Sequence, residues 1–417
     1  MRLAASVAAV AAALLLAGCA SGDAGSKDAG RKSAPPGDSS AVTLADATRP
    51  IPAGTGPVKI SVSDFNSTFS AMKKLKPVTK AGRGLVGVLL PDAVGSDRST
   101  RFDAPYLKRA FSTAGLPSSL LIVQNALGSD ATQFSEAQAA IVRGARVLIL
   151  DPLDSGVGQA IESYAKRHGV SVIDYDWLTL GGSRGYYVSF DDVAVGKAMG
   201  LGLASCVSAW HVKGPKVIVM KGAPTDPRAV LLAQGYDEVL APYFTSGRWT
   251  DVANPAGTCT PAVALSEFIQ QYSAHPGINA ALTPHDLISG PIISYLKGKG
   301  IKAKAFPVTG QQATLPGLRN VLAGYQCGTA YEPDYLEAQG AAAVALFLRA
   351  RLKPPASLLN GRFKDPQSKA SVPSVLFKPV WVTAKNMKST VIADKYVTVA
   401  QLCAAPYAAA CKAAGVT

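Results

Sequence analysis

The stretch "RVLILDPLDSGVGQAIESYAKRHGVSVIDYD", from Arg146 to Asp176, decides the fold of this chain. It begins with a short apolar run, continues through a longer mixed segment, and ends in a second short apolar run. The two apolar runs predict β-strands that are buried on both faces, and the segment between them predicts an α-helix. A strand, a helix and a strand in this order predict two parallel neighbours in one sheet.

The same alternation covers most of the chain. It runs from residue 84 to Asp176, and after "YYVSFDD" (Tyr186–Asp192) it begins again in a second unit of similar size. Apolar strands separated by helices are typical of parallel sheets covered on both faces. A length of 417 residues is enough for two domains. The predicted fold class is therefore α/β, with two doubly wound, Rossmann-like lobes and a cleft at the carboxyl ends of the strands.

The first residues predict an export signal. Arg2 precedes an apolar, alanine-rich run that ends in "LAGC" with Cys19, and this run is shorter than the roughly 20 residues that span a bilayer. Small residues before a cysteine match the bacterial lipoprotein box, so we expect residues 1–18 to be removed and a lipid on Cys19 to anchor the protein outside the cytoplasm. An ordinary secretory signal with a chance cysteine is the alternative. Residues 19–83, which open with Gly-, Ser- and Pro-rich sequence, are expected to form a flexible tether.

Five further cysteines follow the lipoprotein box, and an exported protein can form disulfide bonds. Cys403 and Cys411 are close in sequence, in "CAAPYAAAC", and are expected to pair. A bond between Cys206 and Cys259 is the second expectation, and it would leave Cys327 free. No CxxC or HxxxH spacing indicates zinc, so neither a metal nor a cofactor is expected.

The net charge of +14 raises the question of a nucleic-acid partner. The lysines and arginines are scattered and form no cluster interleaved with aromatic residues, so we expect no nucleic-acid binding. Two enzyme signatures are also missing, since the sequence has no Walker A loop and no GxGxxG after the first strand. Asp151 and Asp154 resemble a carboxylate pair, but a turn beside Pro152 explains them as well. We therefore expect a protein that is not an enzyme.

Five segments taken in order resemble a known family: "VLILDPLDSG", "VIDYDWLTLGG", "YYVSFDDVAVG", "GAPTD" and "PVTGQQAT". They are similar to the periplasmic sugar-binding proteins of ABC importers, in the D-xylose-binding branch of the type I, ribose-binding-like group. The resemblance covers about residues 84–411, and Val172–Gly196 is its most specific part. It implies a monomer that captures a sugar between two lobes by hinge closure and presents the closed form to a membrane permease.

The resemblance also implies how the chain is divided between the lobes. The N-terminal lobe would consist of residues 84–190 and 311–352, and the C-terminal lobe with its tail of residues 191–310 and 353–417. Three segments would cross between the lobes, near Ser189–Val193, Thr309–Gln312 and Val375–Val382.

A sugar site needs charged and amide groups that bind hydroxyls, and aromatic faces that cover the ring. Candidates at the strand ends are Arg98, Asp176, Trp177, Asp192, Asp226, Arg228, Asp286 and Gln312. Other roles stay open for four of them. Asp226 could cap the helix that begins at Pro227, and Trp177 could pack over the Gly181–Gly182 turn. Arg98 could be a surface residue at a helix start, and Asp176 could cap a helix or hydrogen-bond the crossing backbone.

Several of these positions depart from the family's pattern. Arg98-Ser99 stands where relatives have Arg-Trp, and Asp176-Trp177 where they have Asp-Arg. Because a site that binds hydroxyls loses affinity when its partners change, we expect a sugar or sugar-like ligand other than D-xylose. Two alternatives are a sensing module for a signalling partner and a cell-envelope interaction protein that has lost sugar binding.

Overall fold

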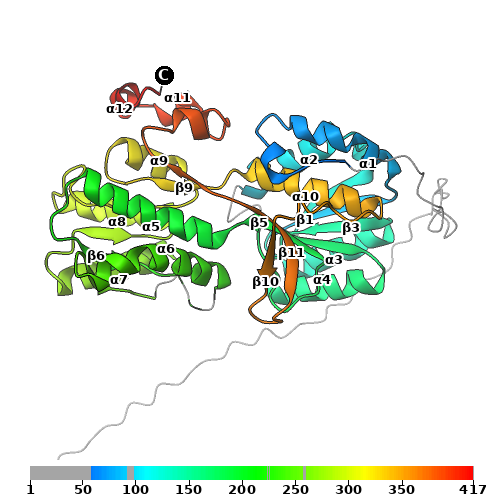
Figure 1. Cartoon of the computed structure of the whole chain (residues 1–417), viewed down its shortest axis with the longest axis horizontal. Helices are drawn as coiled ribbons and strands as arrows, with labels where there is room; N and C mark the ends of the chain where they lie inside the picture. Colours follow the sequence, from blue (N-terminus) through cyan, green and yellow to red (C-terminus); the bar gives the residue numbers. More distant parts are fainter. Residues whose placement is uncertain (1–57, 92–97, 223, 225, 257–259, 417) are drawn as a thin grey trace, which may run out of the picture. The chain divides into compact units, whose positions relative to one another are not determined.

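The computed structural model describes residues 58–91, 98–222, 224, 226–256 and 260–416. Within these residues the chain forms two lobes, each built on its own parallel sheet (Figure 1). The expected export signal, Cys19, the first part of the expected tether, and Cys259 lie outside the described residues.

The first lobe contains a seven-stranded sheet with the strand order β10-β11-β5-β4-β3-β1-β2. The strands are β1 (Leu85–Leu90), β2 (Leu121–Asn125), β3 (Ala145–Leu150), β4 (Ser171–Tyr175), β5 (Tyr186–Phe190), β10 (Gly361–Lys364) and β11 (Ser371–Phe377). All neighbours are parallel except β10 and β11, which form an antiparallel hairpin at the edge. The stretch that opened the sequence analysis is β3, α4 and β4 of this sheet.

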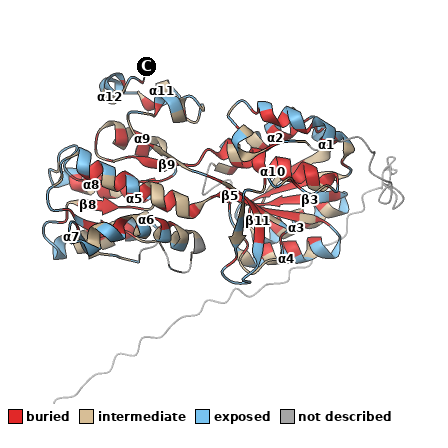
Figure 2. Ribbon diagram, in the orientation of Figure 1, coloured by how far each residue is buried: buried red, intermediate tan, exposed pale blue. Residues whose placement is uncertain are grey.

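Helices cover both faces of the first sheet, because successive side chains of each strand point to opposite faces and both sets are apolar. In β3, Val147 and Ile149 belong to the core under one set of helices, whereas Leu148 and Leu150 belong to the core under the other. Figure 2 shows the buried faces of these helices turned to the sheet. The helices are α1 (Lys76–Ala81), α2 (Ala104–Thr113) and α10 (Asp334–Arg349) on one face, and α3 (Asp130–Val142) and α4 (Ser155–Arg167) on the other.

The second lobe contains a parallel sheet with the order β7-β6-β8 and a short antiparallel pair, β9 and β12. The strands are β6 (Lys216–Val219), β7 (Thr250–Ala253), β8 (Ala280–Leu282), β9 (Thr329–Tyr331) and β12 (Val380–Val382). The helices are α5 (Asp192–Ala209), α6 (Pro227–Thr245), α7 (Pro261–Ala274), α8 (Asp286–Gly298), α9 (Leu315–Leu322), α11 (Val399–Leu402) and α12 (Ala408–Ala413). Short 3₁₀ and π-helical turns complete the described elements: Val62–Asp64, Ser70–Leu75, Ser99–Asp103, Ser118–Leu120 and Lys388–Ile392.

Helices α5 and α6 cross at very short range, and two glycines make this possible. A Cβ atom at Gly196 would collide with the carbonyl oxygen of Leu232, and one at Gly235 with that of Val193. By length and composition α5 could cross a membrane, but 50% of it is buried in the fold. Its close packing with α6 makes it a core helix of the second lobe.

The last part of the segment expected to be a flexible tether, residues 58–83, is folded in the structure. From residue 58 the chain is folded onto the first lobe, and Phe69, Met72 and Leu75 are fully buried. The Phe65 ring packs against Phe377 of β11, and the Phe69 ring against Tyr106 of α2. These apolar side chains gain more by burial than the short segment loses in chain entropy.

The division between the lobes also differs from the expected one. Two crossings, between β5 and α5 and between β11 and β12, lie within the expected segments Ser189–Val193 and Val375–Val382. The third lies between β9 and α10 and not near Thr309–Gln312. Residues 311–331 therefore belong to the second lobe, where a backbone bridge joins Gln311 to Ala330 of β9. Residues 361–377 belong to the first lobe, because β11 extends its sheet by parallel pairing with β5.

The structure corrects one expected disulfide bond. Cys206 of α5 is bonded to Cys327, which precedes β9, and not to Cys259. Cys327 lies in the segment 311–331, which belongs to the second lobe and not to the first. This segment packs beside α5 and so brings Cys327 next to Cys206. Cys403 is bonded to Cys411, as their spacing predicts.

We predict that the Cys206–Cys327 bond contributes about 2–5 kcal/mol to the free energy of unfolding, because it closes a loop of 121 residues. The Cys206→Ser/Cys327→Ser double variant should therefore unfold at lower urea concentration than the wild type. The matched control is Cys403→Ser/Cys411→Ser, which opens a separation of only 8 residues and should cost less. Peptide mapping without reductant should recover Cys206 joined to Cys327, and a peptide joining it to Cys259 would refute the pairing.

Candidate functional site

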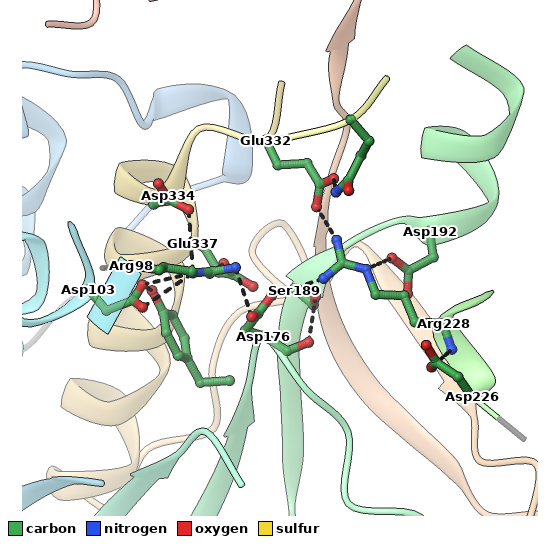
Figure 3. A network of polar contacts seen from close by, with 12 residues as sticks. Arg98, Asp103, Asp176, Ser189, Asp192, Asp226, Arg228, Glu332, Asp334 and Glu337 are labelled. Carbon is green, nitrogen blue, oxygen red and sulfur yellow. Dashed lines mark hydrogen bonds and ion pairs between the residues drawn. The ribbon is translucent and has the colours of Figure 1, made fainter. Parts of the chain in front are cut away.

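The carboxyl ends of the strands bring several of the expected residues together between the lobes. Asp176 and Trp177 follow β4, and Asp192 is the first residue of α5, directly after β5. Arg228 lies in the first turn of α6, after β6. Figure 3 shows two guanidinium groups, those of Arg98 and Arg228, on either side of Asp176.

Arg98 is held by carboxylates of the first lobe. Its Nη1 lies 2.7 Å from Oδ2 of Asp176, and its Nη2 lies 2.5 Å from Oε2 of Glu337 in α10. Its Nε lies 3.2 Å from Oδ2 of Asp103 and 3.5 Å from Oδ1 of Asp334. A guanidinium has five donors in one plane, which suits it to several carboxylates at once.

Arg228 joins the second lobe to the first and to the crossing segment. Its Nη2 lies 2.5 Å from Oε2 of Glu332, and its Nε lies 3.1 Å from Oδ1 of Asp192. Its Nη1 lies 3.5 Å from Oδ1 of Asp176, across the gap between the lobes. Glu332 also accepts a short hydrogen bond from Nε2 of Gln311. The Arg228 side chain therefore contacts the first lobe, the second lobe and the crossing segment.

Asp176 occupies the centre in a strained backbone conformation. Its φ is 60°, in the left-handed region that residues other than glycine rarely adopt. The conformation is fixed by hydrogen bonds, since the Asp176 carbonyl accepts from the Tyr187 and Ser189 hydroxyls, each at 2.9 Å. Its amide donates to the carbonyl of Val188 at 3.0 Å. These contacts direct the carboxylate between Arg98 and Arg228 (Figure 3).

The two arginines face more carboxylates than they can neutralise. Burial raises the pKa of Asp192 to about 7, against the opposing effect of Arg228, and it likewise raises the pKa of Asp334 to about 7 against Arg98. Burial also raises the pKa of Glu337 well above its usual range. Oδ1 of Asp176 and Oδ1 of Asp192 accept no hydrogen bond within the described part of the chain. Each of these oxygens is ion-paired with Arg228 and keeps the capacity to accept a further hydrogen bond.

A pocket of about 350 Å³ opens beside this cluster. Its volume falls in the range of small-molecule sites. The lining combines polar residues with apolar side chains of both lobes. The lining residues are Pro152, Leu153, Asp154, Ser155, Asp176, Trp177, Leu178, Leu180, Tyr187, Asp192, Asp226, Arg228, Leu231 and Phe363.

Trp177 and Asp226 line the pocket in different ways. Trp177 is 48% exposed and contributes an aromatic side chain to the lining. Asp226 is the N-cap of α6, since its Oδ1 accepts from the Arg228 amide at 2.9 Å. This bond is the alternative role expected for Asp226, and it fixes the first turn of α6 that carries Arg228.

Three expected residues do not line the pocket: Arg98, which belongs to the neighbouring polar cluster, Asp286 and Gln312. Asp286 is buried in the second lobe, where its Oδ1 accepts from Gln326 at 2.7 Å and its Oδ2 from the Thr314 amide at 2.8 Å. Gln312 is exposed, and its backbone pairs with Ala330 and Tyr396. Asp286 has the contacts of a residue that fixes the turn before α9.

Four acids of the cluster are not among the expected site residues: Asp103, Glu332, Asp334 and Glu337. A signal for three of them was present in "YEPDYLE", where acids follow the strand that became β9. In α/β sheets ligands bind at the carboxyl ends of the strands, and the other candidates were chosen for that position, so these acids could have been chosen in the same way. Asp103 had no such signal, because it lies in the π-helical turn before α2.

The free energy of unfolding should fall as the pH rises from about 5 to 8. A carboxyl with a raised pKa in the folded state keeps a proton that the unfolded chain has released, so its stabilising effect is lost as the pH passes the folded value, which is about 7 for Asp192. Asp192→Asn keeps the uncharged form at every pH and should make the loss of Tm over this range smaller by about 2–4 °C. The control is Asp191→Asn, because asparagine also caps α5. An equal change in both variants would count against Asp192 as the source.

Solved structures share this fold. An ABC transporter solute-binding protein from Clostridium phytofermentans with bound β-D-glucose matches with a TM-score of 0.64 and 24% identity, over 76% of this chain and 99% of that one. The Caulobacter myo-inositol binding protein matches with a TM-score of 0.55 and 22% identity, over 74% of this chain and 97% of that one. The likenesses confirm the predicted two-lobe α/β fold.

The sequence itself matches a family model and curated proteins. The model of the periplasmic binding protein domain covers residues 104–350. The D-xylose-binding periplasmic protein of Escherichia coli (strain K12) is 32% identical, over 66% of this chain and 81% of that protein. A multiple sugar-binding periplasmic protein of Azospirillum brasilense is 27% identical, over 81% of this chain and 99% of that protein. These relatives are binding proteins, not enzymes. The chain belongs to the periplasmic binding protein family, as its strand-end motifs predict.

Proposed function

We propose that this protein is the extracytoplasmic solute-binding lipoprotein of an ABC importer, and that it captures a sugar or sugar-like molecule other than D-xylose. The observation that carries the proposal is the pocket at the carboxyl ends of the strands, where Asp176, Asp192 and Arg228 meet between the lobes. Relatives whose names include D-xylose or several sugars support the ligand class.

The chemistry of the pocket fits a polyol. Oδ1 of Asp176 and Oδ1 of Asp192 pair with Arg228 but accept no hydrogen bond within the described part of the chain, so they can accept from a ligand. Each sugar hydroxyl is both a donor and an acceptor. Arg228 supplies donors for a ring oxygen or hydroxyl. Trp177, half-exposed at the opening, offers an aromatic face for the C–H surface of the ring.

Capture by closure follows from the same residues. Arg228 of the second lobe pairs with Asp176 of the first and with Glu332 of the crossing segment. A ligand that binds both lobes adds its own hydrogen bonds to this set and so favours the closed form. An ABC permease would then recognise the closed protein.

The ligand should be identified by titrating the full chain with D-xylose, D-glucose, D-galactose and myo-inositol in a calorimeter. We expect stoichiometric binding of a sugar or cyclitol, with D-xylose much weaker than the best ligand. Tight D-xylose binding would overturn the changed specificity. No binding of any sugar or polyol in a wider library would overturn the proposed function.

Arg228→Gln should weaken binding of the best ligand by about 10- to 100-fold, because charge-assisted hydrogen bonds contribute about 1.5–3 kcal/mol each. Arg248→Gln is the matched control, since Arg248 is an exposed arginine of the second lobe that lies over the Tyr243 ring. A thermal melt of each variant separates lost binding from lost folding. Equal affinity for wild type and Arg228→Gln would remove Arg228 from the binding site.

The lipid anchor is a separate part of the proposal, and it rests on the "LAGC" sequence. Cys19→Ser should abolish labelling by radioactive palmitate and move the protein from the membrane fraction to the soluble fraction. Ser26→Ala, a nearby change of similar size, should leave both unchanged. Persistent membrane labelling of Cys19→Ser would refute lipidation at this residue.

A further inference from the structure

A second pocket, of about 320 Å³, adjoins the first. The two share Leu180, Leu231 and Phe363, which line both. Leu231 lies one helical turn after Arg228, so both side chains project from the same face of α6. The polar cluster and the second pocket are therefore parts of one continuous cleft.

The second pocket is mostly apolar. Leu180 and Phe363 from the first lobe face Val230 and Leu231 from the second, and the polar residues there are Lys364 and Gln367. Val230 is 49% exposed, and the other three apolar side chains are only partly buried. Partly hydrated apolar walls inside a cleft favour an apolar occupant, because burying them releases ordered water.

The wall from the first lobe is fixed in place by the β10–β11 hairpin. Asp365, in the turn of this hairpin, pairs with Nη2 of the buried Arg184 at 2.7 Å and accepts from the Gly181 amide at 2.9 Å. The Phe363 ring packs edge-on against Tyr187 at 5.3 Å. These contacts join the hairpin to the turn after β4, so Leu180 and Phe363 are held before any ligand arrives.

A free monosaccharide does not match the whole cleft. Its hydroxyls suit the end with Asp176, Asp192 and Arg228, but they would lose water without gaining partners at the apolar end. We propose that the cleft binds a glycoside, with the sugar against the polar cluster and an apolar aglycone between Leu180, Leu231 and Phe363. This inference rests on the proposed sugar-binding function and names the class of ligand.

The test compares matched ligands on the full chain. Methyl and phenyl glycosides of D-glucose, D-xylose and D-galactose, in both anomers, are titrated by calorimetry beside the free sugars. We expect at least one phenyl glycoside to bind about tenfold or more tightly than its methyl glycoside, as burial of an aromatic ring predicts. Its binding should also show the more negative heat-capacity change.

Variants then locate the aglycone. Leu231→Ser and Val230→Ser should each reduce the ratio of phenyl to methyl affinity to about threefold or less, because they place a hydroxyl in the apolar wall. Leu201→Ser is the matched control, since Leu201 is 60% exposed on α5 and lines neither pocket. This control should keep the wild-type ratio.

The outcomes separate the two proposals. If free sugars and methyl glycosides bind but no phenyl glycoside binds more tightly, the glycoside inference is wrong and the sugar-binding function stands. If the phenyl preference survives in both Leu231→Ser and Val230→Ser, the aglycone lies elsewhere and the inference is again wrong. If neither sugars nor glycosides bind, both proposals fall.

Discussion

The position of the Asp176 carboxylate, between two guanidinium groups, is the constraint on which the site depends. One oxygen lies 2.7 Å from Arg98, which the first lobe holds, and the other lies 3.5 Å from Arg228, which the second lobe provides. A backbone in the left-handed region keeps the carboxylate there. Strain of this kind costs about 1–3 kcal/mol and persists only where the surroundings fix it. Here the fixing contacts come from β5, so the first sheet itself sets the geometry of the site.

The lobe architecture could be predicted because it follows from local patterns. The strands of the first sheet are short apolar runs, and the helices between them have one apolar face, so periodicity alone locates them. The exchange of segments between lobes could not be predicted from such patterns. Whether β11 pairs with β5, or Phe65 packs on Phe377, depends on contacts between residues far apart in sequence. The same reason applies to the Cys206–Cys327 bond, which joins residues 121 positions apart.

Some residues of the site could be predicted from the sequence and others could not. The difference lies in whether a position after a strand is enough to place the side chain in the cleft. Asp176 directly follows β4, and Asp192 and Arg228 lie in the first turns of the helices that come after β5 and β6. The ends of parallel strands meet at one edge of a sheet. Asp286 also follows a strand, yet its carboxylate turns inward to Gln326 and Thr314, because the turn before α9 needs an acceptor. Phe363 is a tail residue in sequence and enters the cleft only because β10 closes the edge of the first sheet.

The excess of carboxylates explains why a ligand with many hydroxyls suits this cleft better than an anion. Buried ion pairs contribute little net stability, since the cost of removing two charges from water offsets their attraction. Their value here is in orientation, because Arg228 keeps Asp192 and Glu332 directed at the gap between the lobes. A ligand carboxylate or phosphate would add negative charge beside acids whose pKa burial already raises. Hydroxyls could instead donate to those oxygens without adding charge, which supports the proposed capture of a polyol.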